Sequence, residues 1–284
     1  MKFSVVILTR DEAVNIRPAL ESCGGIDDVV VLDSFSTDAT VEIARSCGAR
    51  VVQRVFDSFA GQRNDALDSI ALHHSWVFFL DADERFTPAL QAECSAIVAA
   101  DAVSGGMVAS KTLFMGRWIR HASQYPVYQL RLVKRGEVRF EQAGHGQREG
   151  ASRRPLARLR EPYVHDIASK GLAEWMERHI RYARDEAAVI LANRRGSAWR
   201  TAVCELWHID PIRRRRALKI VAACLPMRPA LRFLSLYLFS GGFLDGVPGL
   251  VYCRLMAQYE AMIQAFLRFE AGTTVPPATM SPRS

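Results

Sequence analysis

Along the first hundred residues, short runs of β-branched and aromatic residues alternate with segments of helical periodicity. The apolar runs predict strands buried on both faces, and the segments between them predict helices. Strands are expected at 3–8, 28–32, 50–55 and 76–80, and helices at 13–23, 37–47 and 61–72. This alternation is typical of βαβ units, which build a parallel sheet covered by helices.

Capping residues mark two of the helix starts. Ser36 or Thr37 is expected to cap the second helix, with Asp38 in its first turn. Thr87 followed by Pro88 predicts a fourth helix, because proline is well tolerated at the first helical position after a capping threonine.

After residue 105 the pattern changes. Further strands are expected at 106–112, 127–133 and 138–140, the last two joined by a turn at Arg135-Gly136, and residues 141–162 are expected to form a basic loop. Beyond Ser169 the periodicity is helical. The predicted helix breaks are Pro211, Pro226, Pro229 and Gly241-Gly242. The chain is thus expected to divide into an α/β domain at 1–165, a helical region at 166–272 and a flexible tail at 273–284.

Composition narrows the class of protein. The 284 residues are 49% hydrophobic and 24% charged, which excludes a disordered chain, a collagen-like chain and a disulfide scaffold. Six widely spaced cysteines indicate reduced thiols in a cytosolic protein and no zinc site. The start, Met1-Lys2-Phe3-Ser4, runs directly into a predicted strand, so we expect no secretory signal peptide.

The net charge of +7 conceals an uneven distribution along the chain. Residues 1–110 contain 8 basic and 16 acidic residues, whereas residues 111–284 contain 29 basic and 14 acidic residues. An acidic first part suits a site for a metal or a sugar, and a basic second part suits contact with phosphates of lipid or nucleic acid.

Carboxylates follow three of the predicted strands. Thr9, Asp11 and Glu12 come after the first strand, and Asp33 and Ser34 come after the second. Asp81 and Asp83 come after the fourth. Because ligands of an open parallel sheet bind beyond the carboxyl ends of its strands, these residues mark the expected site.

The pair Asp81-Ala82-Asp83, directly after the apolar run 76–80, is the sharpest of these signals. Two carboxylates at a strand end suit Mg²⁺ or Mn²⁺, which bind oxygen ligands and bridge phosphates. An ion there would neutralise the charge that develops on a leaving diphosphate. The plainer interpretation is a pair of solvated turn aspartates before the next helix.

Other phosphate-binding classes are poorly supported. The chain has neither a GxGxxG after the first strand nor a GxxxxGK[ST] loop, so dinucleotide and P-loop folds are disfavoured. Phosphatases of the haloacid dehalogenase type normally carry their DxD after the first strand, whereas here it follows the fourth.

Four ordered motifs resemble those of family 2 glycosyltransferases, which have the GT-A fold. Thr9-Arg10-Asp11-Glu12 is similar to T-x-N-E, with Asp11 where asparagine is usual. Residues 33–38 match D-S-x-S-T-D, with Phe35 in place of the common glycine. Gln62-Arg63-Asn64 and residues 81–84 match Q-R-N and D-A-D-E.

The resemblance extends over residues 3 to about 270 and is strongest before residue 90. One bacterial subgroup, the lipopolysaccharide-core β-glucosyltransferases and exopolysaccharide transferases, shares further short motifs. These motifs are Gly116-Arg117-Trp118, Tyr125-Pro126, Arg131-Leu132, Glu177 to Tyr182 with Glu186, and Gly242 to Gly246 with Gly249.

The resemblance implies roles for single residues. Asp33 would hold the ribose or base, Asp83 the metal on the diphosphate, and Asp81 the sugar nucleotide or the metal as well. The implied donor-binding set is Thr9, Asp11, Glu12, Asp33, Ser34, Gln62, Arg63, Asn64, Asp81 and Asp83.

An inverting enzyme also needs a general base for the acceptor hydroxyl. The adjacent His-Glu pair usual in this subgroup is absent from residues 144–149, and Glu149 or His145 is our candidate, with Glu141 and Asp166 in reserve. Residues expected to meet the acceptor or its phosphate are Arg117, Arg131, Arg178, His179 and Tyr182.

In the basic second part, arginines such as Arg213–Arg216 and Arg232 flank the apolar stretches 220–227 and 233–244. No stretch reaches the ~20 residues needed to span a bilayer. The pattern favours helices lying on an anionic membrane surface over a helical layer packed on the sheet, and no motif supports nucleic-acid binding.

Together these features predict an inverting glycosyltransferase with a GT-A-type, mainly parallel sheet and a helical C-terminal region. Its donor would be a nucleotide-diphosphate sugar, with a UDP-sugar favoured. Its acceptor would be a glycolipid, a lipid-linked saccharide, lipopolysaccharide or exopolysaccharide, reached from the cytoplasmic membrane face. The alternatives are a nucleotidyltransferase, which usually has a glycine-rich loop after the first strand, and a catalytically inactive sugar-nucleotide-binding or membrane scaffold protein.

Overall fold

The computed structural model describes residues 2–143, 146–195, 204–205, 207 and 227–272. The chain forms two compact units. Unit 1 comprises residues 1–175 and 236–252, and unit 2 comprises residues 176–235 and 253–284. Unit 1 therefore extends beyond the boundary expected at residue 165 and also includes residues 236–252, which were expected in the helical region.

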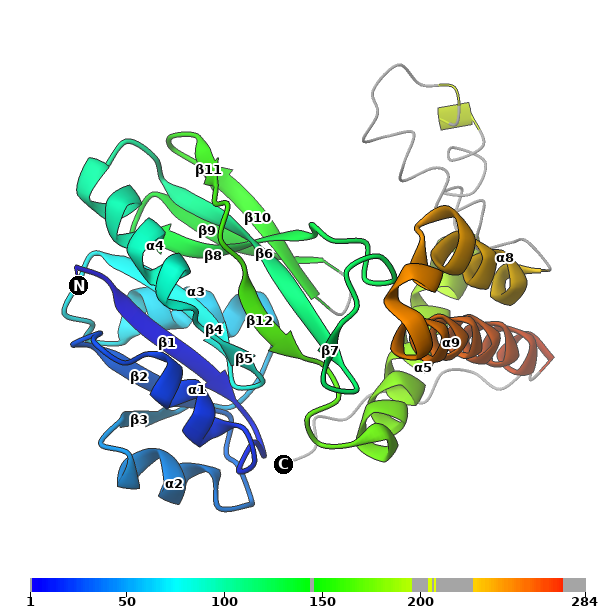
Figure 1. Cartoon of the computed structure of the whole chain (residues 1–284), viewed down its shortest axis with the longest axis horizontal. Helices are drawn as coiled ribbons and strands as arrows, with labels where there is room; N and C mark the ends of the chain where they lie inside the picture. The colour runs from blue at the N-terminus through cyan, green and yellow to red at the C-terminus, as the bar shows by residue number, and fades with distance from the viewer. Residues whose placement is uncertain (1, 144–145, 196–203, 206, 208–226, 273–284) are drawn as a thin grey trace. The chain divides into compact units, whose positions relative to one another are not determined.

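Unit 1 is built on a ten-stranded sheet (Figure 1). Its strands are β1 (Ser4–Thr9), β2 (Val29–Asp33), β3 (Arg50–Gln53), β4 (Trp76–Asp81), β5 (Glu84–Arg85), β6 (Gly105–Phe114), β7 (Arg117–Trp118), β8 (Tyr128–Lys134), β11 (Leu156–Arg158) and β12 (Tyr163–Asp166). The order is β3-β2-β1-β4-β8-β6-β12-β5, and β7 and β11 also pair with β6.

Most strands of this sheet run in one direction. β3, β2, β1 and β4 are mutually parallel, β8 is antiparallel to both β4 and β6, and β12 is parallel to β6. Because two reversals cancel, β12 has the same direction as β1. The predicted mainly parallel α/β sheet is confirmed, and the carboxyl ends of β1, β2, β4 and β12 face the same edge.

Helices cover both faces of the sheet. They are α1 (Ile16–Ser22), α2 (Thr40–Ser46), α3 (Phe59–Ser69) and α4 (Pro88–Ala100). Val5 and Ile7 of β1 belong to a core shared with α1, α2 and α4, whereas Val6 belongs to a core shared with α3. This alternation along a fully buried strand explains why the strands read as continuous apolar runs.

The caps agree with the sequence at one helix and differ at another. The Thr87 hydroxyl accepts from the Leu90 backbone N–H at 3.2 Å, and Pro88 opens α4, as predicted. The prediction that Ser36 or Thr37 caps α2 is wrong, because α2 begins at Thr40 and has no side-chain cap. The Ser36 hydroxyl instead donates to Asp33 at the end of β2, and the Thr37 hydroxyl donates to Asp11 in the loop after β1.

The prediction of a loop over residues 141–162 is also wrong. β9 (Val138–Ala143) and β10 (Gly146–Ser152) form an antiparallel two-stranded sheet, and β11 joins β6 of the main sheet. Charged and small residues give this stretch no apolar alternation, so its strands depend on pairing partners distant from the local sequence pattern.

The returning segment of unit 1 contains a π-helical turn, η1 (Ser235–Phe239), a 3₁₀ turn, η2 (Gly242–Asp245), and the start of α9 (Gly246–Gly272). The predicted break at Gly241-Gly242 is confirmed. Asp245 is buried, and its carboxylate accepts from the backbone N–H groups of His121 and Ala122 at 2.9 and 2.7 Å. This contact ties the segment to the loop between β7 and β8.

Unit 2 is helical, as expected for the C-terminal region. It contains most of α5 (Leu172–Arg195), α8 (Arg228–Leu234) and the later part of α9. Ala183 and Ala187 of α5 pack with Ile263 and Leu267 of α9 in a small core. Pro211, Pro226 and the arginine cluster 213–216 lie outside the described residues.

Within the described ranges, no single helix is long and apolar enough to cross a membrane. One bent pair of segments, Arg228–Phe239 and Gly242–Glu270, reaches that threshold together by length and composition.

Candidate active site

The carboxyl ends of three neighbouring parallel strands bring the sequence motifs together. Thr9 at the end of β1 is in register with Asp33 of β2, and Leu8 is in register with Asp81 of β4. The ladder continues past the strand ends, because Ser34 N–H donates to the Thr9 carbonyl at 2.9 Å and Ala82 N–H to the Leu8 carbonyl at 3.1 Å. The three carboxylate-bearing motifs therefore share one sheet edge.

The loops after β1 and β2 bind each other. Asp11 accepts from the Thr37 backbone N–H at 2.7 Å, and Asp11 N–H donates to the Ser36 hydroxyl at 2.8 Å. Asp11 and Phe35 both adopt left-handed backbone, with φ of 53° and 55°. Glycine and asparagine adopt this conformation most readily. They are also the residues usual in the family at these two positions, where this chain has Phe35 and Asp11.

Asp33 is fully buried. Its carboxylate accepts from the Ser36 N–H at 3.0 Å, from the Ser36 hydroxyl and from the Gln53 side-chain amide at 2.9 Å. Asp33 therefore shapes the loop 34–38 and holds Gln53 at the strand edge.

Asp81 lies between two buried arginines. One of its oxygens accepts from Arg63 at 2.8 Å, and the other accepts from Arg131 at 3.2 Å, while each arginine side chain is only 2% exposed. Burial raises the pKa of the Asp81 carboxyl, but the two guanidinium groups outweigh it and bring the pKa down to about 2. Asp81 is therefore a fixed anion whose two oxygens are both engaged.

Glu84, the last residue of the D-A-D-E motif, completes this buried cluster. Its carboxylate accepts from the Asp81 backbone N–H at 2.9 Å and from Arg131. Burial raises the pKa of Glu84 to about 7, with Arg131 acting in the opposite direction. Arg131 also donates to the Tyr163 hydroxyl at 3.2 Å. The arginine expected to meet an acceptor phosphate is thus part of the interior that fixes the motif.

Asp83 faces His165 from β12. The His165 Nε2 atom lies 3.3 Å from an Asp83 oxygen, with side-chain exposures of 28% and 15%. Burial lowers the pKa of the His165 imidazole, yet the Asp83 carboxylate outweighs it and raises the pKa to about 9. Sequence reasoning missed His165. The available signal was its position directly after the short apolar pair Tyr163-Val164.

The segment after β12 returns to the loop after β1. Asp166 N–H donates to the Asp83 carbonyl at 3.2 Å. Lys170 pairs with Glu12 at 2.6 Å and donates to the Asp11 carbonyl at 2.8 Å, and the Asn15 amide donates to the Ser169 hydroxyl. Residues 165–170 therefore border the same edge as Asp83. Lys170 was also missed, because nothing local distinguishes it from a surface lysine.

The side chains of the Q-R-N motif at the start of α3 contact different parts of unit 1. The Gln62 amide donates to the Ser34 hydroxyl at 3.0 Å, and Asn64 exchanges hydrogen bonds with the Phe140 backbone at 2.9 and 3.0 Å. Asn64 thus joins α3 to β9. The Gln62 Oε1 and Thr9 Oγ1 atoms are buried without a hydrogen-bond partner. Such orphaned atoms at a sheet edge indicate a place for a ligand or ordered water.

A divalent cation fits Asp83 and His165 better than Asp81. Both oxygens of Asp81 are taken by arginines, whereas Asp83 and His165 present an oxygen and a nitrogen donor on partly exposed side chains. Among the described residues, no group of three or more histidine, cysteine or acidic side chains is arranged to hold a metal. The protein would thus supply two ligands, and water or donor phosphates the others, as Mg²⁺ usually requires.

The candidates for the general base lie in different places. Glu149 is exposed on β10, in register with Phe140 of β9, and Glu141 pairs with Arg148 at 2.8 Å on the same two strands. His145 lies outside the described residues. Asp166 follows His165 on β12, beside Asp83.

The acceptor candidates belong to both units. Arg117 is exposed at the start of β7 in unit 1. His179 and Tyr182 belong to α5 in unit 2, where the His179 ring lies 5.8 Å from that of Tyr182 and 5.5 Å from that of Tyr259. Arg178 belongs to the same unit.

Comparison with curated proteins identifies relatives of the first part of the chain. An uncharacterized glycosyltransferase of Rickettsia bellii is 40% identical over 99 residues, covering 34% of this chain and 33% of that protein. The lipopolysaccharide core biosynthesis glycosyltransferase LpsC of Rhizobium meliloti is 28% identical over 147 residues, covering 50% of this chain and 54% of LpsC. The chain thus matches about a third to a half of the length of these relatives.

Two solved structures show a weak overall likeness. S. aureus TarS 1–349 aligns with a TM-score of 0.44 at 17% identity, covering 96% of this chain and 92% of that one. Glucosyl-3-phosphoglycerate synthase from Mycobacterium tuberculosis, in complex with Mn²⁺ and uridine-diphosphate-glucose, aligns with a TM-score of 0.33 at 25% identity, covering 39% and 43%.

The family model supplies the decisive match. The model described as "Glycosyl transferase family 2" matches residues 4–146, half of the chain, and includes all four motifs of the sheet edge. The mainly parallel sheet with its helical C-terminal region is the GT-A-type architecture that these motifs imply. This chain belongs to glycosyl transferase family 2.

Proposed function

We propose that this chain is an inverting glycosyltransferase that uses a nucleoside diphosphate sugar, with a UDP-sugar favoured. Its acceptor would be a lipid-linked saccharide, lipopolysaccharide or exopolysaccharide at the inner face of the bacterial cytoplasmic membrane. Family membership supports the reaction class, and the relative LpsC supports the acceptor class. The observation that carries the proposal is the register of β2, β1 and β4, which gathers Asp33, Thr9 and Asp81 at one edge.

Different residues of this edge would serve the donor in different ways. Thr9 and Gln62 offer buried oxygen atoms without partners, which suit hydroxyl or imide groups of a nucleoside. Asp33 would act by fixing the loop 34–38 that surrounds the nucleoside, because its own carboxylate is already bonded. Asp81, held by Arg63 and Arg131, would keep the D-A-D-E turn rigid.

Asp83 and His165 would hold a Mg²⁺ or Mn²⁺ ion on the donor diphosphate. When bound, the ion would neutralise the negative charge that grows on the leaving diphosphate. Binding requires His165 to release its proton, because a ligating imidazole is neutral.

Transfer with inversion is a single displacement. An acceptor oxygen forms a bond to the anomeric carbon as the bond from that carbon to the diphosphate oxygen breaks. The acceptor proton passes to a carboxylate, and the electron pair leaves with the diphosphate. Glu149 is our candidate for that carboxylate, and Asp166 is the competing one, supported by its position beside Asp83.

The two candidates give different results in a paired substitution. If Glu149 is the base, Glu149→Gln should lower transfer to the acceptor by about 10²–10⁴-fold while donor binding persists. Asp166→Asn should then change transfer far less. The reverse ranking, measured as kcat with binding of the donor followed separately, would reassign the base to Asp166.

The donor site itself is tested by calorimetry with UDP-, GDP- and dTDP-sugars, each with Mg²⁺, with Mn²⁺ and with a chelator. We expect one nucleotide class to bind tightly only when metal is present. Equal binding of all donors with and without metal would contradict the proposed site. Formation of a sugar nucleotide from a sugar phosphate and a nucleoside triphosphate would indicate a nucleotidyltransferase.

A further inference from the structure

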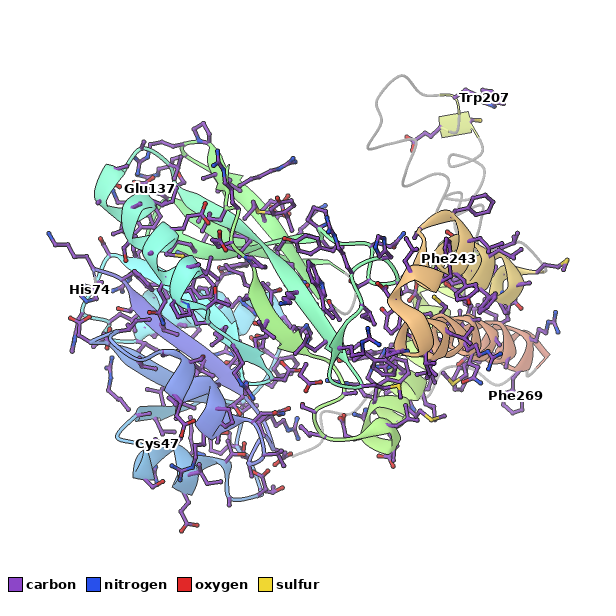
Figure 2. The ribbon with its side chains drawn as sticks, viewed as in Figure 1. Cys47, His74, Glu137, Trp207, Phe243 and Phe269 are labelled. Atoms are coloured by element: carbon purple, nitrogen blue, oxygen red, sulfur yellow. The ribbon has the colours of Figure 1, made fainter. Side chains whose placement is uncertain are left out.

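A group of large apolar side chains is exposed on the returning segment of unit 1. This apolar lobe consists of Leu238, Phe239, Phe243, Leu244 and Val247, which are 52%, 88%, 49%, 63% and 66% exposed. Figure 2 labels Phe243 on this segment. The five side chains come from three consecutive short elements within ten residues, η1, η2 and the start of α9. Grouped apolar exposure of this kind marks an interaction surface, whereas single exposed residues do not.

The lobe is fixed to the rest of unit 1. Asp245 bonds to two backbone amides of the loop between β7 and β8, and the Tyr252 ring packs edge-on against Phe114 of β6 with centroids 5.9 Å apart. The Gln124 side chain also donates to the Ser240 hydroxyl at 3.4 Å. These contacts bracket the lobe on both sides, so its apolar side chains are presented by an anchored backbone.

The exposed arginines and the lack of exposed carboxylates make the two segments that carry and anchor the lobe basic. In residues 115–127 and 236–252, the two segments that form this part of unit 1, the only acidic residue is Asp245, and it is buried. Arg120 is exposed on the loop that Asp245 holds, and Arg117 is exposed on β7 directly before it. The Arg117 guanidinium lies 4.0 Å from the position that a Cβ on Gly246 would take, directly beside the lobe.

We propose that the apolar lobe, with Arg117 and Arg120, docks unit 1 on an anionic phospholipid surface. Phe239, Phe243 and Leu244 would enter the boundary between headgroups and acyl chains, and the two arginines would pair with lipid phosphates. Apolar side chains that project beside arginines, in segments whose only acidic residue is buried, suit binding to an anionic lipid surface. A protein partner would have to be both acidic and apolar at the same place.

Docking through this lobe would serve the proposed function, because the acceptor proposed above is carried by a lipid. The inference does not require that reaction, since none of the five lobe residues is among the residues proposed to bind the donor. The two can therefore fail independently. Donor hydrolysis in solution, measured on the same protein samples, reports on the active site alone.

The experiment is co-sedimentation of the full chain with vesicles of phosphatidylcholine alone or mixed with phosphatidylglycerol. We expect binding to the mixed vesicles only. The double variant Phe239→Ser/Phe243→Ser should lose at least about tenfold in affinity, and Arg117→Gln/Arg120→Gln about fivefold per arginine, with added salt weakening the wild type similarly. Phe239→Ser/Phe243→Ser should keep the far-UV circular dichroism and the donor hydrolysis of the wild type.

Phe269→Ser is the matched control, because Phe269 is a 71% exposed aromatic outside the lobe, and it should bind vesicles as the wild type does. Equal binding to neutral and anionic vesicles would overturn the proposal, as would unchanged binding of the lobe variants. The proposal would also be overturned if the wild type did not bind vesicles but formed a dimer that Phe239→Ser/Phe243→Ser converts to a monomer. That result would assign the lobe to contact with a second copy of the chain.

Discussion

Replacing Asp83 by asparagine is expected to lower kcat/KM for sugar transfer by about a thousandfold. Asp83 is the carboxylate of the D-A-D-E turn that faces His165, whereas Asp81 is held by Arg63 and Arg131. Asparagine keeps the size of the side chain but removes the charge that would attract a divalent ion. Because the ion would act on the leaving diphosphate, the loss should fall mainly on the chemical step.

The measurement compares wild type and variant across a metal titration, with unfolding followed in parallel. Asp68→Asn is a suitable control, because Asp68 is a half-exposed carboxylate that pairs with the equally exposed Arg139 at 2.7 Å. It should leave transfer within about twofold, as expected for a surface pair. An Asp83→Asn enzyme that retains full metal-dependent transfer would remove Asp83 from the proposed donor site.

Replacing Arg131 by methionine is expected to reduce the free energy of unfolding by about 3–5 kcal/mol. Arg131 is 2% exposed and is the ion-pair partner of Glu84, which is 1% exposed, as well as of Asp81. Methionine restores much of the volume but leaves a buried carboxylate without its compensating charge. Denaturant titration measures the loss, and Arg139→Met, which breaks only the exposed pair with Asp68, should cost under about 1 kcal/mol.

The same variant has a predictable pH dependence. The pKa of Glu84 is raised from 4.5 to about 7 in the folded state. Between these two pH values the folded state binds more protons than the unfolded state, so the free energy of unfolding falls as the pH rises from 4.5 to about 7. Without Arg131 the ionised form is less favourable still, and the deficit of Arg131→Met should grow between pH 6 and 8. The double variant Arg131→Met/Glu84→Gln should recover part of the loss. A deficit independent of pH and of Glu84 would mean that Arg131 acts through packing alone.

The strands that end at the carboxylate edge of the sheet are well predicted by the sequence, because the relevant information is local. Runs such as 76–80 are apolar throughout and end at a carboxylate, and strand pairing then places Asp81 beside the end of β1. Direction was also predictable, since strands separated by helices pair in parallel. The family match rests on the same continuous stretch.

The partners of those carboxylates are not predictable in this way. His165 lies 82 residues after Asp83 and meets it only because β12 joins the sheet beyond β8 and β6. Arg131 belongs to β8, which runs antiparallel to both of its neighbours, β4 and β6, and its burial depends on the insertion of β8 between them. Single charged residues in amphipathic strands look the same in sequence whether they face solvent or a buried anion, and tertiary pairing decides between them.

The division of the chain into interleaved units has a consequence for biosynthesis. Unit 1 is discontinuous: its first segment ends at residue 175, and it is completed only by residues 236–252. A nascent chain emerging from the ribosome can pair β1 with β2 and β4 early, but Asp245 reaches the loop at His121 only after more than a hundred further residues have been made. Native contacts of such long sequence separation form late and slowly. The apolar side chains around η1 and η2 therefore emerge last in unit 1, more than a hundred residues after the loop that anchors them, and they stay unanchored until Asp245 binds that loop.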